Sequence, residues 1–135
     1  REALEVNMGT LAMKQGRFEE AQKRYSRSLI AMQSRLGAEH PRTMNAHWGL
    51  AEALEGQGRY AGARAAIDES IRIGETGGLG PGSLARPRLV RARILVEGAL
   101  DPEAGRAEAA RVLADTLAHT PEDVELIADA QALLD

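Results

Sequence analysis

A short motif occurs twice in this chain of 135 residues, and the interval between its copies restricts the folds that the chain can adopt. Residues 15–18 read Gln-Gly-Arg-Phe, and residues 57–60, 42 positions later, read Gln-Gly-Arg-Tyr. The same interval relates Ala21 to Ala63, Ser28 to Ser70 and Leu29 to Ile71. A fixed period of this size is typical of stacked supersecondary units, each of which buries its apolar face against its neighbours. The repeat therefore predicts an elongated array, a kind of protein that more often presents binding surfaces than catalytic sites.

The spacing of apolar residues predicts that the repeated units are helical. In residues 18–35 they recur every three or four positions and form one stripe, at Phe18, Ala21, Tyr25, Leu29 and Met32. The same criterion predicts seven helices, at 2–14, 18–35, 41–56, 60–75, 84–98, 102–118 and 121–134. We therefore expect an all-α fold, an α-solenoid of three antiparallel helix pairs followed by a C-terminal capping helix.

Turn and capping residues separate the predicted helices. Gly16 is free to adopt a positive φ and so to end the first helix. Residues 74–83 contain five glycines and one proline, so we expect a flexible joint there. Asp101 and Pro102 suit the start of one helix, and Thr120-Pro121 suits the start of the last. In that last helix the spacing places Val124, Ile127, Ala128, Gln131 and Leu134 on one face.

Three further features recur in the first two helix pairs. A large residue precedes a small one at Met8-Gly9 and Leu50-Ala51, glycine occupies the turns at Gly16 and Gly58, and alanine precedes a large residue by four positions at Ala21…Tyr25 and Ala63…Ile67. This pattern resembles the tetratricopeptide repeat over about residues 2–76. The longer period of 42, together with the segment 36–41, is similar to the repeats of kinesin light chains and their bacterial relatives. HEAT and armadillo repeats have similar lengths but lack this turn signature.

The resemblance implies one tetratricopeptide-like domain over residues 1–135. Its expected parts are repeat 1 (2–40), repeat 2 (41–83), a degenerate repeat 3 (84–119) and a terminal helix (121–134). The third repeat is degenerate because Ala99-Leu100-Asp101-Pro102 stands where the Gln-Gly-Arg motif is expected.

The residues give no support to a catalytic, metal or cofactor site. The sequence contains no cysteine, which excludes thiol nucleophiles and thiolate metal ligands. Its three histidines, at 40, 47 and 119, lack the His-Glu-x-x-His spacing of zinc enzymes. The glycine-rich segment 77–83 lacks the lysine that a phosphate-binding loop requires after its last glycine. We expect no enzymatic activity and no cofactor.

The resemblance implies a concave groove, lined by the first helix of each pair, that binds an extended or helical peptide. The groove positions carried over are Asn7, Thr10, Lys14, Asn45, Trp48, Glu52, Glu55, Arg88, Arg91 and Ile94. The family's two-carboxylate clamp for chaperone tails is not reproduced, because Val6, Thr10 and Gly49 occupy its expected lysine and asparagine positions. For Trp48, packing in the core and exposure in the groove are both open.

Arg88 and Arg91 are expected to anchor an acidic or phosphorylated segment. They lie three apart on a helix and so share one face, and guanidinium groups bind carboxylate and phosphate bidentately. Replacing both would then leave stability within about 0.5 kcal/mol, as for ordinary surface positions. The competing arrangement is ion pairing within the chain, to acids such as Asp101, Glu103 and Glu108.

Charge is unevenly distributed along the chain. Residues 1–50 carry a net charge of +3, residues 51–100 of +1 and residues 101–135 of −7. Arginines at 86, 88, 91 and 93 form a basic cluster, so a nucleic-acid adaptor is a third hypothesis after a peptide-binding module and a self-associating one.

The setting is inferred from composition and from the family resemblance. The chain has 15 arginines against 2 lysines and is rich in Ala and Gly, which suggests a GC-rich bacterial genome. Similar bacterial arrays often follow a serine/threonine kinase domain or belong to transcription regulators. Because the sequence begins at Arg1 and shows no signal peptide or membrane span, we expect a fragment of a cytoplasmic signalling protein whose partners are proteins or peptides.

Overall fold

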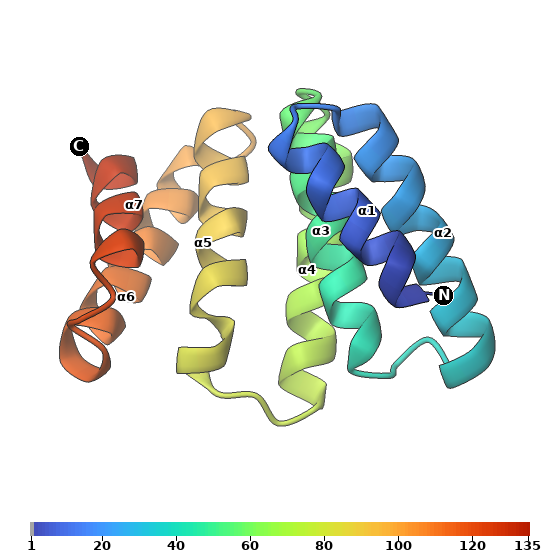
Figure 1. The fold of residues 1–135 in the computed structure, drawn as a ribbon. Coiled ribbons are helices and arrows are strands. Elements are labelled where there is room, and N and C mark those ends of the chain that lie inside the picture. The colour runs from blue at the N-terminus through green and yellow to red at the C-terminus, as the bar shows by residue number, and fades with distance from the viewer. Residues whose placement is uncertain (1) are drawn as a thin grey trace.

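The computed structural model describes residues 2–135 and contains seven helices and no strand over that range (Figure 1). The helices are α1 (Glu2–Lys14), α2 (Phe18–Leu36), α3 (Arg42–Gly56), α4 (Tyr60–Thr76), α5 (Pro81–Glu97), α6 (Pro102–His119) and α7 (Val124–Leu134). The prediction of an all-α fold is confirmed. The first residue of the expected domain, Arg1, lies outside the described residues.

The helices stack in chain order, each against the next, and the two ends of the chain lie at opposite ends of the stack (Figure 1). The first helices of successive pairs, α1, α3, α5 and α7, also contact one another along the stack. Each of the four apolar clusters joins a helix pair to the pair or helix that follows it. Residues of α3, α4 and α5 share one core around Ile67 and Ile94, and residues of α5, α6 and α7 share another around Val112 and Leu126.

The first two turns are nearly identical because the same residues build them. Gly16 and Gly58 have φ of +72° and +75°, as expected for a left-handed C-cap. The N–H of Arg17 then donates to the carbonyl of Ala12 (2.8 Å), and the N–H of Arg59 donates to that of Leu54 (2.9 Å). In the third turn the positive φ of 54° falls on Ala99 instead of a glycine.

Small residues on α3 let α2 approach closely. The stripe that α3 turns toward α2 is Ala46, Gly49, Ala53 and Gly56. A Cβ added to Gly49 would lie 2.5 Å from Cζ of Tyr25, and one added to Gly56 would lie 2.5 Å from Cδ1 of Phe18. The rings of Tyr25 and Phe18 therefore pack against α3 at positions where any residue larger than glycine would clash.

The equivalent stripe of α5, 42 residues further on, is Arg88, Arg91, Leu95 and Gly98. Gly98 still receives a ring, because an added Cβ would lie 2.5 Å from Cγ of Tyr60. The two arginines instead meet carboxylates of α4. In the third pair, charge pairing thus replaces part of the close packing between neighbouring pairs.

Three boundary expectations are corrected. Helix α5 begins at Pro81 and α4 continues to Thr76, so the glycine-rich joint is confined to residues 77–80. Helix α7 begins at Val124 and not at residue 121, because the carboxylate of Asp123 caps it by accepting from the N–H of Leu126 (3.2 Å). The buried face of α7 carries Leu126 and Ala130, while Val124 is 72% exposed.

Candidate functional site

The four arginines of α5 divide into two sets on opposite sides of the helix. Arg86 donates to Asp123 at the start of α7 (2.8 and 3.0 Å), and Arg93 donates to Glu55 of α3 (2.5 and 2.7 Å). Arg88 and Arg91 instead meet α4 and α6. Because positions two apart in a helix are rotated by about 200°, the first set faces the first helices and the second set faces the second helices.

The surface on the side of α5 that faces the first helices, which we call the first-helix surface, includes Trp48, Glu52 and Glu55 of α3 among the predicted groove residues. Asn7, Thr10, Lys14 and Asn45 are exposed on α1 and α3. The Thr10 hydroxyl lies 3.0 Å from the hydroxyl of Tyr25, a residue for which the sequence suggested only packing. Burial raises the pKa of the Tyr25 hydroxyl, and the hydrogen bond with Thr10 partly offsets this.

Glu52 and Glu55 form the acidic centre of this surface, and Arg93 binds both. The Arg93 guanidinium hydrogen-bonds to Glu55 and lies 3.7 Å from Glu52. Burial raises the pKa of the Glu52 carboxyl above its ordinary value, against the attraction of Arg93. The hydrogen bonds to Glu55 raise the pKa of the Arg93 guanidinium. Much of this charge is therefore satisfied within the chain.

Trp48 combines the two roles that the sequence left open. It is half-buried and packs against the core cluster shared by α3, α4 and α5. It also lines a pocket of about 370 Å³ that extends to the start of α5, the end of α6 and the start of α7; Pro81, Arg86, His119, Asp123 and Leu126 are among its other lining residues. The indole N–H is buried and has no hydrogen-bond acceptor among the described residues.

The structure corrects the placement of Ile94, which the sequence assigned to the groove. Its side chain is fully buried in the core cluster that joins α5 to α3 and α4. Ile94 lies 42 residues after Glu52, so the two residues occupy equivalent positions in their repeats. Glu52 reaches the surface at this position, whereas Ile94 is part of the core.

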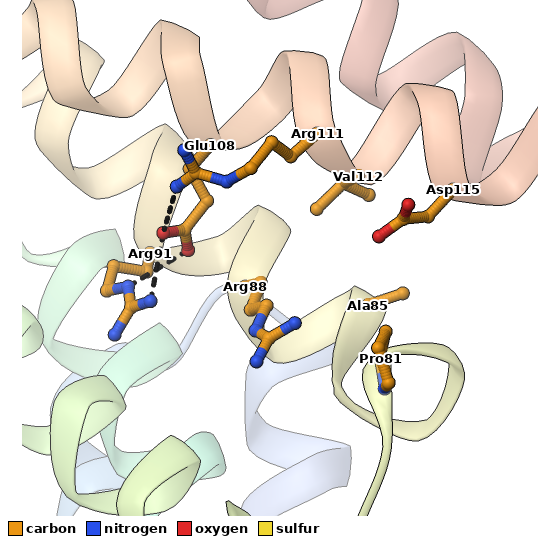
Figure 2. Close-up of a pocket in the computed structure, with 8 residues that line it drawn as sticks. All are labelled: Pro81, Ala85, Arg88, Arg91, Glu108, Arg111, Val112 and Asp115. Atoms are coloured by element: carbon orange, nitrogen blue, oxygen red, sulfur yellow. Dashed lines mark hydrogen bonds and ion pairs between the residues drawn. The ribbon is translucent and has the colours of Figure 1, made fainter.

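Arg88 and Arg91 are also placed differently from the expectation, because they lie on the second-helix side. Arg91 of α5 binds Glu108 of α6 bidentately, with both N–O distances 2.9 Å (Figure 2). It also lies 3.4 Å from Asp68 of α4. Arg88 donates a single hydrogen bond, to Glu75 of α4 (3.1 Å). Of the three acids expected to compete for these arginines, Glu108 binds one of them.

A second pocket, of about 230 Å³, opens on this side between α5 and α6 (Figure 2). Its lining residues are Pro81, Ala85, Arg88, Arg91, Glu108, Arg111, Val112 and Asp115. It adjoins the Trp48 pocket, with which it shares Pro81, Ala85 and Asp115.

The sequence reasoning missed Arg86 and Arg93 as members of the first-helix surface. Their separation by seven positions, two helical turns, was an available sign that they share a face different from that of Arg88 and Arg91. The direction of that face depends on which helices surround α5, and a single sequence does not contain this information.

Both surfaces offer hydrogen-bonding and apolar contacts, the means of holding a partner. Over the part of the chain that the structure describes, no group of three or more His, Cys, Asp or Glu side chains is placed to hold a metal ion. Across the same residues, no helix is long and apolar enough to cross a membrane.

Comparison with known proteins identifies the repeat. No curated protein matches the chain. The model of the family described as tetratricopeptide repeat matches residues 1–76, which span helices α1 to α4. Repeats of this family are in general modules of protein–protein interaction. From its family match and its stack of paired helices, the chain belongs to the tetratricopeptide repeat family.

Proposed function

We propose that this chain is a non-enzymatic module that binds a segment of a partner protein along the first-helix surface. The observation that carries the proposal is the Trp48 pocket, because it is open, partly apolar and lined by residues of the first helices α3, α5 and α7 as well as by the end of α6. Half-exposed aromatic side chains in such pockets are common anchors of protein interfaces.

Exposed polar residues of the first helices support recognition of an extended segment. Asn7, Thr10, Lys14 and Asn45 offer exposed amide, hydroxyl and ammonium groups on α1 and α3. Arg86 adds a charge at the pocket and Glu52 adds one on α3, although each also has a partner within the chain. A segment with an apolar side chain for the Trp48 pocket and flanking hydrogen-bonding groups suits this arrangement.

The experiment selects peptides from a random library displayed on phage and measures their affinities by calorimetry. We expect Asn45→Ala and Lys14→Glu to weaken the selected peptides about tenfold, as for loss of one or two good polar contacts. Arg106→Ala, on the exposed side of α6, is the control and should leave binding unchanged. Because Trp48 is the only tryptophan, its fluorescence should also change on binding. Binding that ignores the α1 and α3 variants would contradict the proposed surface.

A second candidate function is end-to-end association with another copy. Leu4 and Leu11 of α1 are 60% and 55% exposed. They stand 42 residues before Ala46 and Ala53, which are buried on the α3 stripe that packs against α2. Light scattering over a range of concentrations tests this candidate, and a mass that rises in the wild type but not in Leu4→Glu/Leu11→Glu would support it.

Nucleic acid is the least favoured partner, because each of the four α5 arginines has a carboxylate partner within the chain. The larger setting that we propose, on composition and family resemblance, is a bacterial cytoplasmic signalling protein such as a serine/threonine kinase. Sequencing the parent gene tests this setting, and the kinase motifs His-Arg-Asp and Asp-Phe-Gly upstream of the repeats would support it.

A further inference from the structure

The pocket between α5 and α6 contains more guanidinium donors than its own carboxylates use. Glu108, which is buried, is satisfied by the bidentate bond from Arg91. Arg111 lies 3.8 Å from the same carboxylate, too far for a hydrogen bond, and is 71% exposed. Arg111 is therefore a surplus cation at this end of the pocket (Figure 2).

Arg88 is the second under-used group. A guanidinium carries five N–H donors, and Arg88 uses one of them, toward Glu75 at 3.1 Å. Its side chain is 26% exposed, and it lines the same pocket as Arg91 and Glu108 (Figure 2). Its remaining donors have no acceptor among the described residues, so an acceptor from outside can bind them.

The opposite end of the pocket has a different chemistry. Ala85 and Val112 provide an apolar wall, and Asp115 of α6 contributes a carboxylate that makes no ion pair within the described part of the chain. The volume of about 230 Å³ has room for several water molecules at roughly 30 Å³ each. A carboxylate or phosphate group therefore has space to enter next to Arg88 and Arg111, away from Asp115.

We propose that this pocket binds an oxyanion on a partner side chain, a carboxylate or a phosphate, between Arg88 and Arg111. Arg91 stays bound to Glu108 and holds α5 and α6 at the spacing that keeps the pocket open. Asp115 repels a second negative charge and favours an N–H or ammonium group on the neighbouring part of the segment. This site does not depend on the proposed function, since its donors lie on the second-helix side of α5.

The test uses isotope-labelled protein and two simple probes, inorganic phosphate and acetate, at constant ionic strength. The Nε–Hε resonances of arginine side chains are followed by NMR during each titration. Saturable shifts confined to Arg88, Arg111 and the α6 backbone beside them support the site. Saturation by phosphate alone points to a phosphorylated side chain, and saturation by both probes extends the site to Asp and Glu side chains.

Matched variants separate binding at the pocket from general charge screening. Arg88→Gln and Arg111→Gln should each raise the dissociation constant about tenfold, the expected loss of affinity for one charge-assisted contact. Asp115→Asn should lower the dissociation constant by a few-fold, because one charge that repels the anion is removed. Arg106→Gln, an exposed arginine on the same helix as Arg111, is the control and should change nothing.

Two results would overturn the proposal. One is a set of linear shifts that are as large at Arg106 as at Arg111, which is the signature of screening. The other is unchanged affinity in both glutamine variants, provided that their helical spectra and melting curves match the wild type. If Arg88→Gln unfolds, Arg88→Lys replaces it, because lysine keeps the charge but loses the planar pair of donors.

Discussion

Tyr25 of α2 shows how single residues control the stacking of helix pairs. Its ring lies between Gly9 of its own pair and Gly49 of the next, and a Cβ added to Gly9 would lie 3.0 Å from ring atoms Cε1 and Cζ. Both glycines are helical and have ordinary φ values, so their role is to leave space for the ring. The same ring therefore sets the crossing within the first pair and the contact between the first two pairs.

Substitution of these glycines is expected to destabilise the stack. Gly49→Ala and Gly9→Leu should each lower the free energy of unfolding by about 1–3 kcal/mol, because they overpack a close contact. Gly62→Ala is the matched control, since Gly62 is exposed in α4 and an added Cβ meets only Leu54, at an ordinary 3.4 Å. It should stabilise by about 0.5–1 kcal/mol through helix propensity. Urea unfolding measures both effects. Changes of the same sign in the free energy of unfolding for Gly49→Ala and Gly62→Ala would contradict the claim that the Tyr25 ring requires glycine at position 49.

Arg91 provides the second prediction, because the sequence and the structure lead to different expectations for the effect of its replacement on stability. Treated as a surface residue, it should tolerate replacement, but it is the main partner of the buried Glu108. Arg91→Ala should cost on the order of 2–3 kcal/mol, because it leaves a buried carboxylate unpaired. Replacing both partners, as Arg91→Met with Glu108→Leu, should recover most of this loss. Thermal melts of the two variants test the claim, and a double variant no better than the single one would refute it.

His47 provides a prediction about pH. Burial lowers the pKa of His47 below its ordinary value of 6.5, and the charge of Glu69 partly opposes this. As the pH falls, the unfolded chain therefore binds a proton at His47 before the folded chain does. The contribution of neutral His47 to the free energy of unfolding is complete above pH 6.5 and is lost as the pH falls below it. The melting temperature should drop between pH 7.5 and pH 5.5, and His47→Gln should show a smaller drop. Parallel curves for the two proteins would exclude His47 as the cause.

At the scale of elements, the three turns show which parts of the repeat are interchangeable. Phe18, Tyr60 and Pro102 begin the second helices at intervals of 42, although the third turn lacks the Gln-Gly-Arg motif of the other two. There, the carboxylate of Asp101 accepts from the N–H of Ala104 (3.1 Å) and replaces the glycine motif as the start signal. Different local hydrogen bonds thus produce the same helix spacing.

Ala99 should be a weak point of the third turn. Its φ of 54° places it in the left-handed region, which costs a non-glycine residue roughly 1–2 kcal/mol. Ala99→Gly should therefore stabilise the protein slightly, by about 0.5–1 kcal/mol after the added entropy of the unfolded chain is subtracted. The same exchange at Ala110, exposed within α6, should destabilise by about the same amount. Chemical denaturation of both variants provides the comparison, and a destabilised Ala99→Gly would contradict the argument.

At the scale of the whole molecule, the match to the family ends before the stack of packed helices does. It covers residues 1–76, yet the core of the second pair continues into α5 through Val90 and Ile94. Ile67 and Ile71 are at most 1% exposed in the complete stack and would lose part of that cover without α5. The third pair therefore packs on the core of the second and covers its apolar end.

Truncation tests this dependence. A chain that ends after Thr76 should be less stable by a few kcal/mol, since full burial of one isoleucine side chain contributes about 1.5–3 kcal/mol. A chain that ends after His119 loses only α7 and keeps the α3–α4–α5 core, so it serves as the comparison. Melting temperatures measured by circular dichroism distinguish the two, and a 1–76 fragment as stable as the complete chain would show that α5 contributes nothing to that core.

The sequence by itself determined the helices, the turns and the period, because these depend on local hydrogen bonds, caps and backbone preferences. Gly16 and Gly58 end their helices as expected, and all seven predicted helices begin within three residues of the observed positions, including that started by Asp101-Pro102. The apolar stripe of α2 also predicted its buried residues Ala21, Tyr25 and Met32. For α5 and α7, only the tertiary structure decided which way the helix is rotated about its axis. Ile94 turned inward, Val124 turned outward, and Arg88 and Arg91 met α4 and α6. Rotation depends on what packs against a helix from every side, and residues far apart in the sequence provide those surfaces.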